Sequence, residues 1–319
     1  MLDYRIENAT IFNGVEFADY EELGIKDGVI AATGNRGATA RHVIDGTGKL
    51  LTPAFVDTHS HADFLVSHAD NDGCSSVSQG IGTLIVGTCG MSSVPLTDTF
   101  PLLSPKINDK NLSCKDHLKY VENSLSLNIG ELIGHNTLRL SVMGAAKEAT
   151  VSEVAEMCAL LDEFLSAGWL GMSVGLNYPE AAGYSRRELL ELSKVLATHN
   201  RPLTCHIRDQ ADGILHAMDE VIGITAEAGC RVLLSHLRPL RTAANRGLCI
   251  VDEMERRFDE NCHAHFDMYP YVGGCTTLNL FFEISLQIDP KESAPIPLDL
   301  VDKAVQRSNT HGYADIHVI

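Results

Sequence analysis

The sequence predicts an α/β fold: an incomplete TIM-like (β/α) barrel of about seven βα units, preceded by a small N-terminal antiparallel β unit. From residue 51 onward, short apolar runs alternate with stretches of helical periodicity, as expected for a parallel sheet of right-handed βα units. Before residue 51, the apolar runs are separated by turn dipeptides instead. We therefore divide the chain into residues 1–50 and 51–319, with residues 281–319 as an insertion or tail.

The first 50 residues have the pattern of short strands joined by tight turns. The clearest pair is residues 23–26 and 29–31, which flank the dipeptide Asp27-Gly28. Asp-Gly between two apolar runs is a strong hairpin signal. We expect this part to form a small β-sandwich or barrel unit.

Seven apolar runs after residue 51 have the length of buried strands: 54–58, 83–87, 131–134, 171–174, 203–206, 232–236 and 265–269. Helical periodicity is clearest between the later runs, at 151–167, 185–198, 213–228 and 250–261. Ser185 followed by Glu188 has the spacing of a capping box at the start of one helix. Seven units approach the eight of a complete barrel.

The composition is that of a packed globular protein. Of 319 residues, 45% are hydrophobic and 21% charged. The net charge of −17 argues against nucleic acid and anionic membranes as partners, since both require a basic surface. We find neither a signal-peptide pattern nor an apolar run of the ~20 residues that a membrane span needs. We therefore expect a cytoplasmic protein, in which most of the nine cysteines are buried thiols.

The most informative motif is His59-Ser60-His61, which follows the apolar run 54–58. Alternate side chains of an extended strand point the same way, so these two imidazoles can face one point. A single pair of this kind is a weak signal. Its value lies in the residues that end the later strands.

A thiol and two further imidazoles stand at the ends of other predicted strands. Cys89 follows the second strand, His206 ends the fifth and His236 ends the sixth. Barrel active sites lie at the carboxyl ends of the strands, so we expect these side chains to meet His59 and His61 at one rim. Any one of them alone is more often a structural residue. Imidazole and thiolate together are the preferred ligands of zinc.

These residues lie in blocks that resemble the N-acyl-D-amino-acid deacylases (D-aminoacylases) of the metal-dependent amidohydrolase superfamily. The blocks occur in the family's order from about residue 4 to 280: PAFVDTHSHAD, SQGIGTLIVGTCGMS, IGHNTLR, GLNYPE, TCHIRDQADGILHAMDEV, LLSHLRP and FDMYPYVGGCTTL. The most specific block contains Gly-Thr-Cys-Gly at residues 87–90, because a cysteine metal ligand after strand two marks this branch.

The resemblance implies a metal site and a reaction. It implies that Cys89, His206 and His236 bind the tighter Zn²⁺, and that His59 and His61 contribute to a second, weaker or vacant metal position. The implied reaction is hydrolysis of the linear amide of a small-molecule N-acyl-D-amino acid.

The resemblance also indicates residues for the substrate. Tyr178 and Tyr269 match positions that contact the substrate in this family. Arg208 and Arg238 are candidates for neutralising a substrate carboxylate, since the guanidinium fork suits that group. The alternative for both arginines is a structural ion pair.

One element of the family pattern is missing. The proton-shuttling aspartate of the superfamily ends the eighth strand, and the sequence stops before such a strand. The aspartates after Tyr271 do not follow an apolar strand: Asp289, Asp299, Asp302 and Asp315. We therefore assign no catalytic acid–base, and expect little deacylase activity from this chain alone. We also expect self-association through the open barrel edges.

Two other functions remain open. A cyclic amidase of the dihydroorotase or hydantoinase kind uses the same chemistry, but those enzymes usually carry a bridging lysine, and Cys89 argues against them. A non-catalytic metal-binding remnant would keep the fold without the reaction, which the missing eighth strand favours. Metal content and a substrate screen separate the three.

Overall fold

The computed structural model describes residues 1–18, 22–34, 37–63, 74–95, 114–122, 125–144, 148–178, 181, 183–261 and 263–269. The expected tail 281–319 and the aspartates after Tyr271 lie outside the described residues. The chain forms two compact units, one of Met1–Val56 with Ser75–Thr83 and one of Asp57–Cys74 with Leu84–Ile319.

The first unit contains a four-stranded sheet of order β4-β3-β1-β5. Its strands are β1 (Leu2–Glu7), β3 (Glu22–Lys26), β4 (Val29–Thr33) and β5 (Ala40–Asp45). β3 pairs antiparallel with β1 and β4, and the β3–β4 hairpin turns at Asp27-Gly28, where both residues have positive φ. β5 adds to β1 in parallel. Beside this sheet, β2 (Thr10–Ile11) pairs with β6 (Leu50–Leu51).

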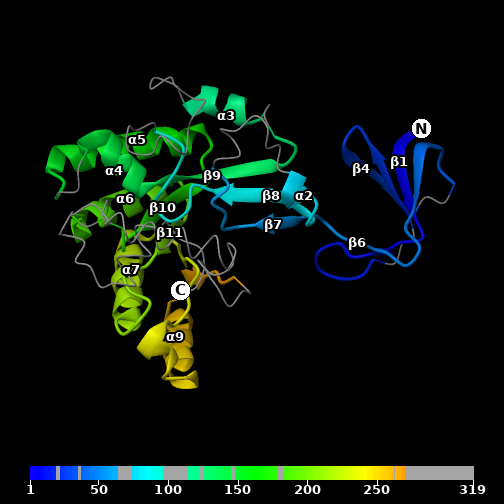
Figure 1. Ribbon diagram of the computed structural model, residues 1–319. Coiled ribbons are helices and arrows are strands. Elements are labelled where there is room, and N and C mark those ends of the chain that lie inside the picture. The colour runs from blue at the N-terminus through cyan, green and yellow to red at the C-terminus, as the bar shows by residue number, and fades with distance from the viewer. Residues whose placement is uncertain are drawn as a thin grey trace, which may run out of the picture. The chain divides into compact units, whose positions relative to one another are not determined.

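The larger sheet has seven strands whose spatial order follows the chain order from β7 to β13. The strands are β7 (Phe55–Asp57), β8 (Ile81–Val86), β9 (Asn128–Gly134), β10 (Gly171–Gly175), β11 (Leu203–His206), β12 (Val232–Leu234) and β13 (Ala264–Phe266). Parallel pairing from β9 to β13 and the curl of the sheet confirm the predicted incomplete barrel of seven βα units (Figure 1). β7 and β13 are its edge strands, and self-association through them stays a prediction.

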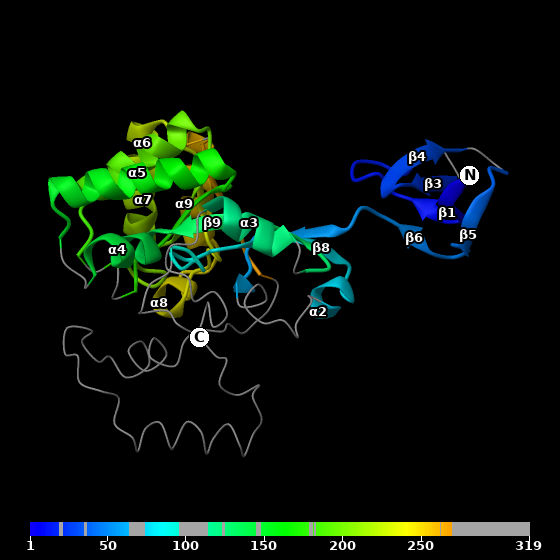
Figure 2. The ribbon, with the colours of Figure 1, turned by 90° about the horizontal axis from the view of Figure 1, so that it is seen from above.

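Helices cover the outside of the curled sheet (Figures 1 and 2). Five of them are α4 (His135–Met143), α5 (Val151–Ala167), α6 (Arg186–Thr198), α7 (Ile214–Ala228) and α9 (Leu248–Glu260). Three others are α2 (Cys74–Val77), α3 (Cys114–Glu122) and α8 (Arg241–Ala244). α5 packs on α6, and α6 on α7, through apolar side chains that include Leu161, Leu192 and Met218.

The start of α5 carries the capping box that the sequence pattern assigned to α6. Thr150 accepts the N–H of Glu153, and the Glu153 carboxylate accepts the N–H of Thr150. At the start of α6 the Ser185 side chain accepts the N–H of Glu188, but the Glu188 carboxylate does not accept the N–H of Ser185. The prediction of a full box at Ser185 is wrong, because the buried Arg139 takes that carboxylate instead.

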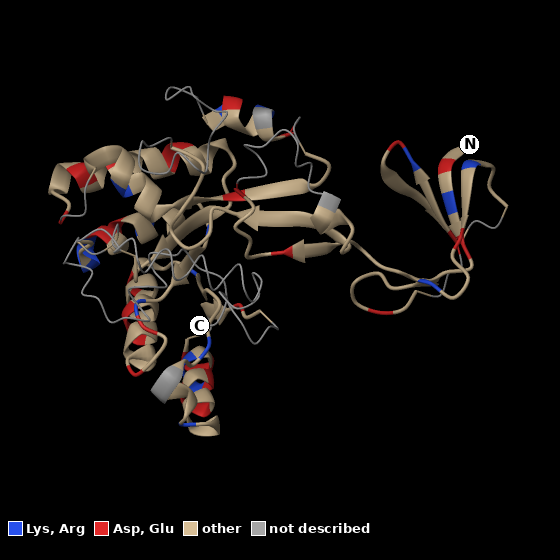
Figure 3. Cartoon of the chain, in the orientation of Figure 1, with Lys and Arg blue, Asp and Glu red and all other residues tan. Residues whose placement is uncertain are grey.

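The charged residues of the larger unit lie mainly on its helices, as expected when the strands are buried beneath them. In Figure 3 most acidic and basic residues of the larger unit lie on the helices, and the strands carry few. The strands β8, β10 and β12 contain no charged residue. Within the described ranges, the structure has no helix with the length and hydrophobicity to cross a membrane.

Candidate metal centre

The five side chains predicted as metal ligands meet at the carboxyl-terminal edge of the parallel sheet. They come from four strand ends: His59 and His61 follow β7, Cys89 follows β8, His206 is the last residue of β11, and His236 follows β12. Parallel strands place their carboxyl ends on one edge, so residues far apart in the sequence become neighbours.

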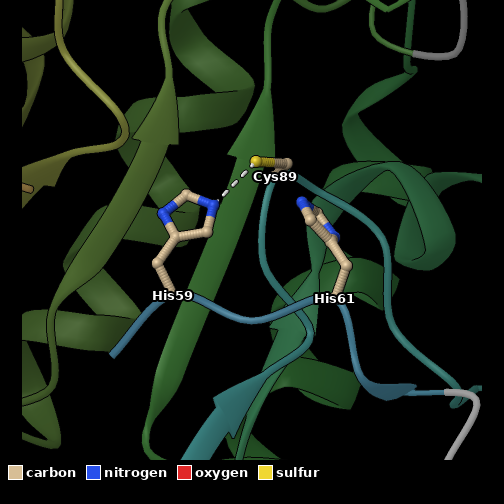
Figure 4. A group of neighbouring side chains, drawn as sticks. All are labelled: His59, His61 and Cys89. Atoms are coloured by element: carbon tan, nitrogen blue, oxygen red, sulfur yellow. Dashed lines mark hydrogen bonds between the residues drawn. The ribbon is translucent and has the colours of Figure 1, made fainter. Parts of the chain in front are cut away.

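Cys89 belongs to two groups of potential ligands. Its Sγ atom lies 3.3 Å from Nε2 of His59, and the ligand atoms of His59, His61 and Cys89 lie within 4.8 Å of one another (Figure 4). The same Sγ lies 3.4 Å from Nε2 of His236, which is 3.0 Å from Nδ1 of His206. The ligand atoms of this second group are also within 4.8 Å of one another. The two imidazole pairs therefore share one thiol.

These spacings fit a tetrahedral ion with nitrogen and sulfur ligands. Zn–N bonds of ~2.0–2.1 Å and Zn–S bonds of ~2.3 Å place neighbouring ligand atoms about 3.3–3.6 Å apart. The two sulfur–nitrogen separations, 3.3 and 3.4 Å, are close to this range. The two ring nitrogens of His206 and His236, 3.0 Å apart, need to separate by about 0.3 Å to match it.

Burial and mutual repulsion keep three of the imidazoles neutral. His61 is exposed as a residue, but the neighbouring side chains desolvate its ring, and this loss of hydration, followed by the charge of His59, lowers its pKa to about 4. Burial lowers the pKa of His236 to about 4, and burial with the charge of His236 lowers the pKa of His206 well below its ordinary value. A neutral imidazole offers the lone pair that a metal ion requires.

His59 differs from the other three because a carboxylate contacts its ring. Burial alone would lower the pKa of His59, but hydrogen bonds to Asp267 and Cys89 outweigh it and raise the pKa to about 10, so Nε2 of this ring has to release its proton before an ion can bind there. The Asp267 carboxylate lies 2.9 Å from Nδ1 of His59. Asp267 lies within the seventh predicted strand, 265–269, and was not identified from the sequence as a site residue. Its position near the end of a strand, beside other strand ends with ligand side chains, was the available signal.

The loop that carries Cys89 is held by the hydroxyl of Ser173 on β10. Cys89 has φ +53°, in the left-handed region that is uncommon for non-glycine residues. Ser173 Oγ accepts the N–H of Gly90 at 2.9 Å and donates to the carbonyl of Gly87 at 2.5 Å. The Ser173 side chain is fully buried, so both backbone groups find their partner away from water.

The start of α4 supports the other side of this loop. The carbonyl of Gly90 accepts the N–H groups of Asn136 at 2.9 Å and Thr137 at 3.2 Å. Gly90 has φ +83°, and a Cβ there would lie 2.5 Å from Oδ1 of Asn136. Only glycine fits at this position, which explains the Gly that follows Cys89.

The backbone of His236, like that of Cys89, is in the left-handed region, with a φ of +38°. Nε2 of Gln210 lies 3.0 Å from Nδ1 of the His236 ring. This contact leaves Nε2 of His236 directed at Cys89. Gln210 was not identified from the sequence, because nothing in its local pattern indicates a contact with a residue 26 positions away.

Among the predicted substrate residues, Tyr178 lies beside a proposed ligand, and Arg238 and Tyr269 lie against each other. The Tyr178 ring contacts the His206 ring edge to face, with centroids 5.2 Å apart. The Arg238 guanidinium lies over the Tyr269 ring, 4.9 Å from its centroid. Burial raises the pKa of Tyr269, so its hydroxyl stays protonated.

Arg208 lies beside a carboxylate and an aromatic ring. Its guanidinium lies 3.4 Å from the Glu220 carboxylate and 5.0 Å from the centroid of the Tyr184 ring. Tyr184 donates its hydroxyl hydrogen bond to the same carboxylate. The charge of Arg208 is thus already paired, as the ion-pair alternative for this residue requires.

The chain resembles known proteins in both sequence and structure. No family model matches the chain. It is 34% identical over 290 residues to an N-acyl-D-aspartate deacylase of Alcaligenes xylosoxydans xylosoxydans, covering 87% of this chain and 58% of that protein. It is 31% identical over 270 residues to a D-aminoacylase of the same organism, covering 81% and 54%. A solved N-acyl-D-glutamate deacylase of Bordetella bronchiseptica matches with a TM-score of 0.78 at 32% identity, covering 86% and 59%.

Over most of its own length the chain is thus homologous to N-acyl-D-amino-acid deacylases. It spans less than two thirds of the length of the relatives it matches. The Bordetella member was solved with zinc and a phosphonate inhibitor that mimics the tetrahedral intermediate of its reaction. A D-hydantoinase structure, 14% identical with a TM-score of 0.55, shares the fold of this chain.

Proposed function

We propose that the protein is a zinc-dependent deacylase that hydrolyses the amide bond of N-acyl-D-amino acids. The observation that carries this proposal is the Cys89 thiol shared by two imidazole pairs at the carboxyl end of a parallel sheet. This chain, which has that thiol, is homologous to an N-acyl-D-aspartate deacylase and a D-aminoacylase.

The proposed metal ligands divide into two sets. Cys89, His206 and His236 would hold one zinc ion, and His59 and His61 would share Cys89 in a second, weaker position. When bound, zinc polarises the scissile carbonyl and lowers the pKa of a water toward ~7. The low pKa of the His236 ring keeps it neutral, the form that can bind the ion.

The substrate would lie against aromatic side chains beside the proposed ligands. Arg238 and Tyr269 support a site for a carboxylate, because the guanidinium over the ring offers fixed hydrogen-bond donors. Tyr178, against the His206 ring, would line the side nearest the metal. Arg208 is the second candidate for a carboxylate, at the cost of its pairing with Glu220. We assign the proton-transfer role to no residue that the structure describes.

Stereoselective substrate recognition tests the proposal. The zinc-loaded protein is offered N-acetyl derivatives of aspartate, glutamate and methionine as D and L enantiomers, and the released amino acid is measured. Binding of D and L phosphonate analogues is measured by calorimetry in parallel, so a slow reaction does not hide recognition. We expect zinc-dependent hydrolysis or binding for the D series alone. Equal behaviour of both series, or activity that persists after chelation, would contradict the proposal.

A cyclic amidase is the second candidate. A D-hydantoinase of Rhizobium radiobacter is 36% identical over 95 residues, which cover 28% of this chain and 20% of that protein. Hydantoins and dihydroorotate therefore belong in the same assay. Turnover of these rings without turnover of linear D amides would favour this candidate. Metal binding without any turnover or recognition would favour a non-catalytic metal-binding protein.

A further inference from the structure

Asp267, the first residue after β13, contacts two of the proposed ligands at once. Its Oδ2 and Oδ1 atoms lie 2.9 and 3.2 Å from Nδ1 of His59. Oδ1 also accepts the backbone N–H of His236 at 2.5 Å. The Asp267 side chain is only 17% exposed, so water competes weakly for these contacts.

The contact with His59 determines which ring nitrogen faces the thiol. A carboxylate only accepts hydrogen bonds, so Nδ1 of His59 carries the proton. Nε2 of the same ring is then directed at Cys89, 3.3 Å from its Sγ atom. Carboxylates that accept from the distal nitrogen of a metal-binding histidine orient its ring and raise its basicity.

The contact with His236 acts on its backbone instead. The φ of His236, +38°, is costly for a non-glycine residue and persists only when its surroundings hold it. Asp267 makes three hydrogen bonds to residues 234–237, the segment that contains His236. Its carboxylate accepts from His236, its N–H donates to the carbonyl of Leu234 at 3.0 Å, and its carbonyl accepts from Leu237 at 2.9 Å. The His236 ring is thereby kept 3.4 Å from the Cys89 thiol.

We infer that Asp267 is a positioning residue that couples the two proposed metal positions, an inference that rests on the proposed function. One carboxylate orients His59 through its ring and His236 through its backbone. The two segments it joins follow β7 and β12, and Asp267 itself follows β13, so the link connects the two edge strands of the sheet.

Cobalt titration of Asp267→Asn and Asp267→Ala tests this inference. Asparagine has the same shape but a single acceptor oxygen, so it can keep the His236 contact while its NH₂ group faces the protonated Nδ1 of His59. We expect the Asn variant to bind one cobalt ion about 10- to 100-fold more weakly and to keep the other. The Ala variant loses both contacts, and we expect both ions to bind more weakly. The thiolate-to-cobalt absorption band and the bound-metal content report the two positions without any substrate.

Asp162→Asn is the matched control. Asp162 also contacts a histidine ring, with Oδ1 2.7 Å from Nε2 of His199, but this pair lies on the surface and neither residue is a proposed ligand. We expect this variant to bind cobalt like the unaltered protein. Circular dichroism and thermal unfolding establish that each variant is folded. If the Ala variant does not fold, the isosteric Asn variant decides.

The outcomes separate this inference from the proposed function. Unaltered cobalt affinity and spectrum in both Asp267 variants would overturn the inference and leave the deacylase proposal intact. An unaltered protein that binds no cobalt would overturn both. Cobalt binding that responds to Asp267 as expected, without recognition of D substrates, supports the inference and overturns the function alone.

Discussion

The thiol of Cys89 and the ring of His236 lie 3.4 Å apart although 147 positions separate them in the sequence. Both residues have left-handed backbones, with φ of +53° and +38°. Such conformations cost about 1–3 kcal/mol each and persist at functional sites that hold them. The fold therefore accepts backbone strain at two points in order to bring one thiol and one imidazole together.

Cys89→Ala should remove both metal positions, because the thiol belongs to both ligand groups. Loss of a direct ligand should weaken zinc binding by more than the about 10- to 100-fold typical of an indirect partner. His61→Ala should weaken only one position. Zinc content after dialysis against a weak chelator measures both effects. Cys249→Ala, at an exposed free cysteine, is the control and should retain full zinc content.

Ser173→Ala should destabilise the protein by about 1–3 kcal/mol, because it leaves the buried N–H of Gly90 and carbonyl of Gly87 without their partner. Urea unfolding of the metal-free protein measures this loss. Ser193 is equally buried, and its hydroxyl has no hydrogen-bond partner among the described residues, so Ser193→Ala should change stability little. Similar losses in both variants would contradict the role given to Ser173.

Glu188→Gln should destabilise the protein by about 3–5 kcal/mol, because it removes the charge of the buried carboxylate that pairs with Arg139 and His135. Nη1 of Arg139 lies 2.6 Å from Oε1 of Glu188, and Nε2 of His135 lies 2.7 Å from the same oxygen. All three side chains are almost completely buried. Thermal unfolding at pH 7 with chelator present measures the effect.

The same carboxylate predicts a dependence of stability on pH. Burial would raise the pKa of Glu188, but His135 and Arg139 outweigh burial and hold the pKa below its ordinary value of 4.5. The ionised carboxylate therefore contributes stability that is fully present above about pH 4.5 and is lost as the pH falls through the lower, folded pKa. The stability of the unaltered protein should fall more steeply below pH 4.5 than that of Glu188→Gln. Parallel curves for the two proteins would contradict this assignment.

Arg238→Met and Arg208→Met should differ in what they change. If Arg238 binds the substrate carboxylate, its loss removes a charged hydrogen bond worth about 1.5–3 kcal/mol, which corresponds to a Kd for a D phosphonate analogue about 10- to 150-fold higher. Arg208 pairs with Glu220, so its loss should have a small effect on this Kd. Calorimetric binding and thermal unfolding of both variants measure the effects. A larger effect of Arg208 on the Kd would reverse the assignment.

Much of the fold could be predicted because local patterns determine it. The helix predicted at 151–167 is α5 over the same residues, since its apolar spacing and its Gly168 stop agree. The strand predicted at 203–206 is β11. The parallel addition of β5 to β1 was not predicted, because pairing of strands distant in sequence leaves no turn signal between them.

The meeting of the five proposed ligands could also be predicted, because strand parity and the common end of parallel strands bring them together. Ser173, Gln210 and Asp267 could not be identified in the same way. Their partners lie 83, 26 and 208 positions away, and each acts through a contact that only the assembled sheet creates. The Glu188 carboxylate was assigned to a helix cap for the same reason: its true partner, Arg139, is 49 positions away.

The link between Asp267 and His59 joins positions 208 residues apart and has a consequence for biosynthesis. The chain emerges from the ribosome amino terminus first, and contacts of such long range form late in folding. The His-x-His segment is thus synthesised long before the carboxylate that orients it. We therefore expect full affinity at the proposed metal positions only after the seventh strand has docked, so tight metal binding would mark chains that have finished assembling this edge of the sheet.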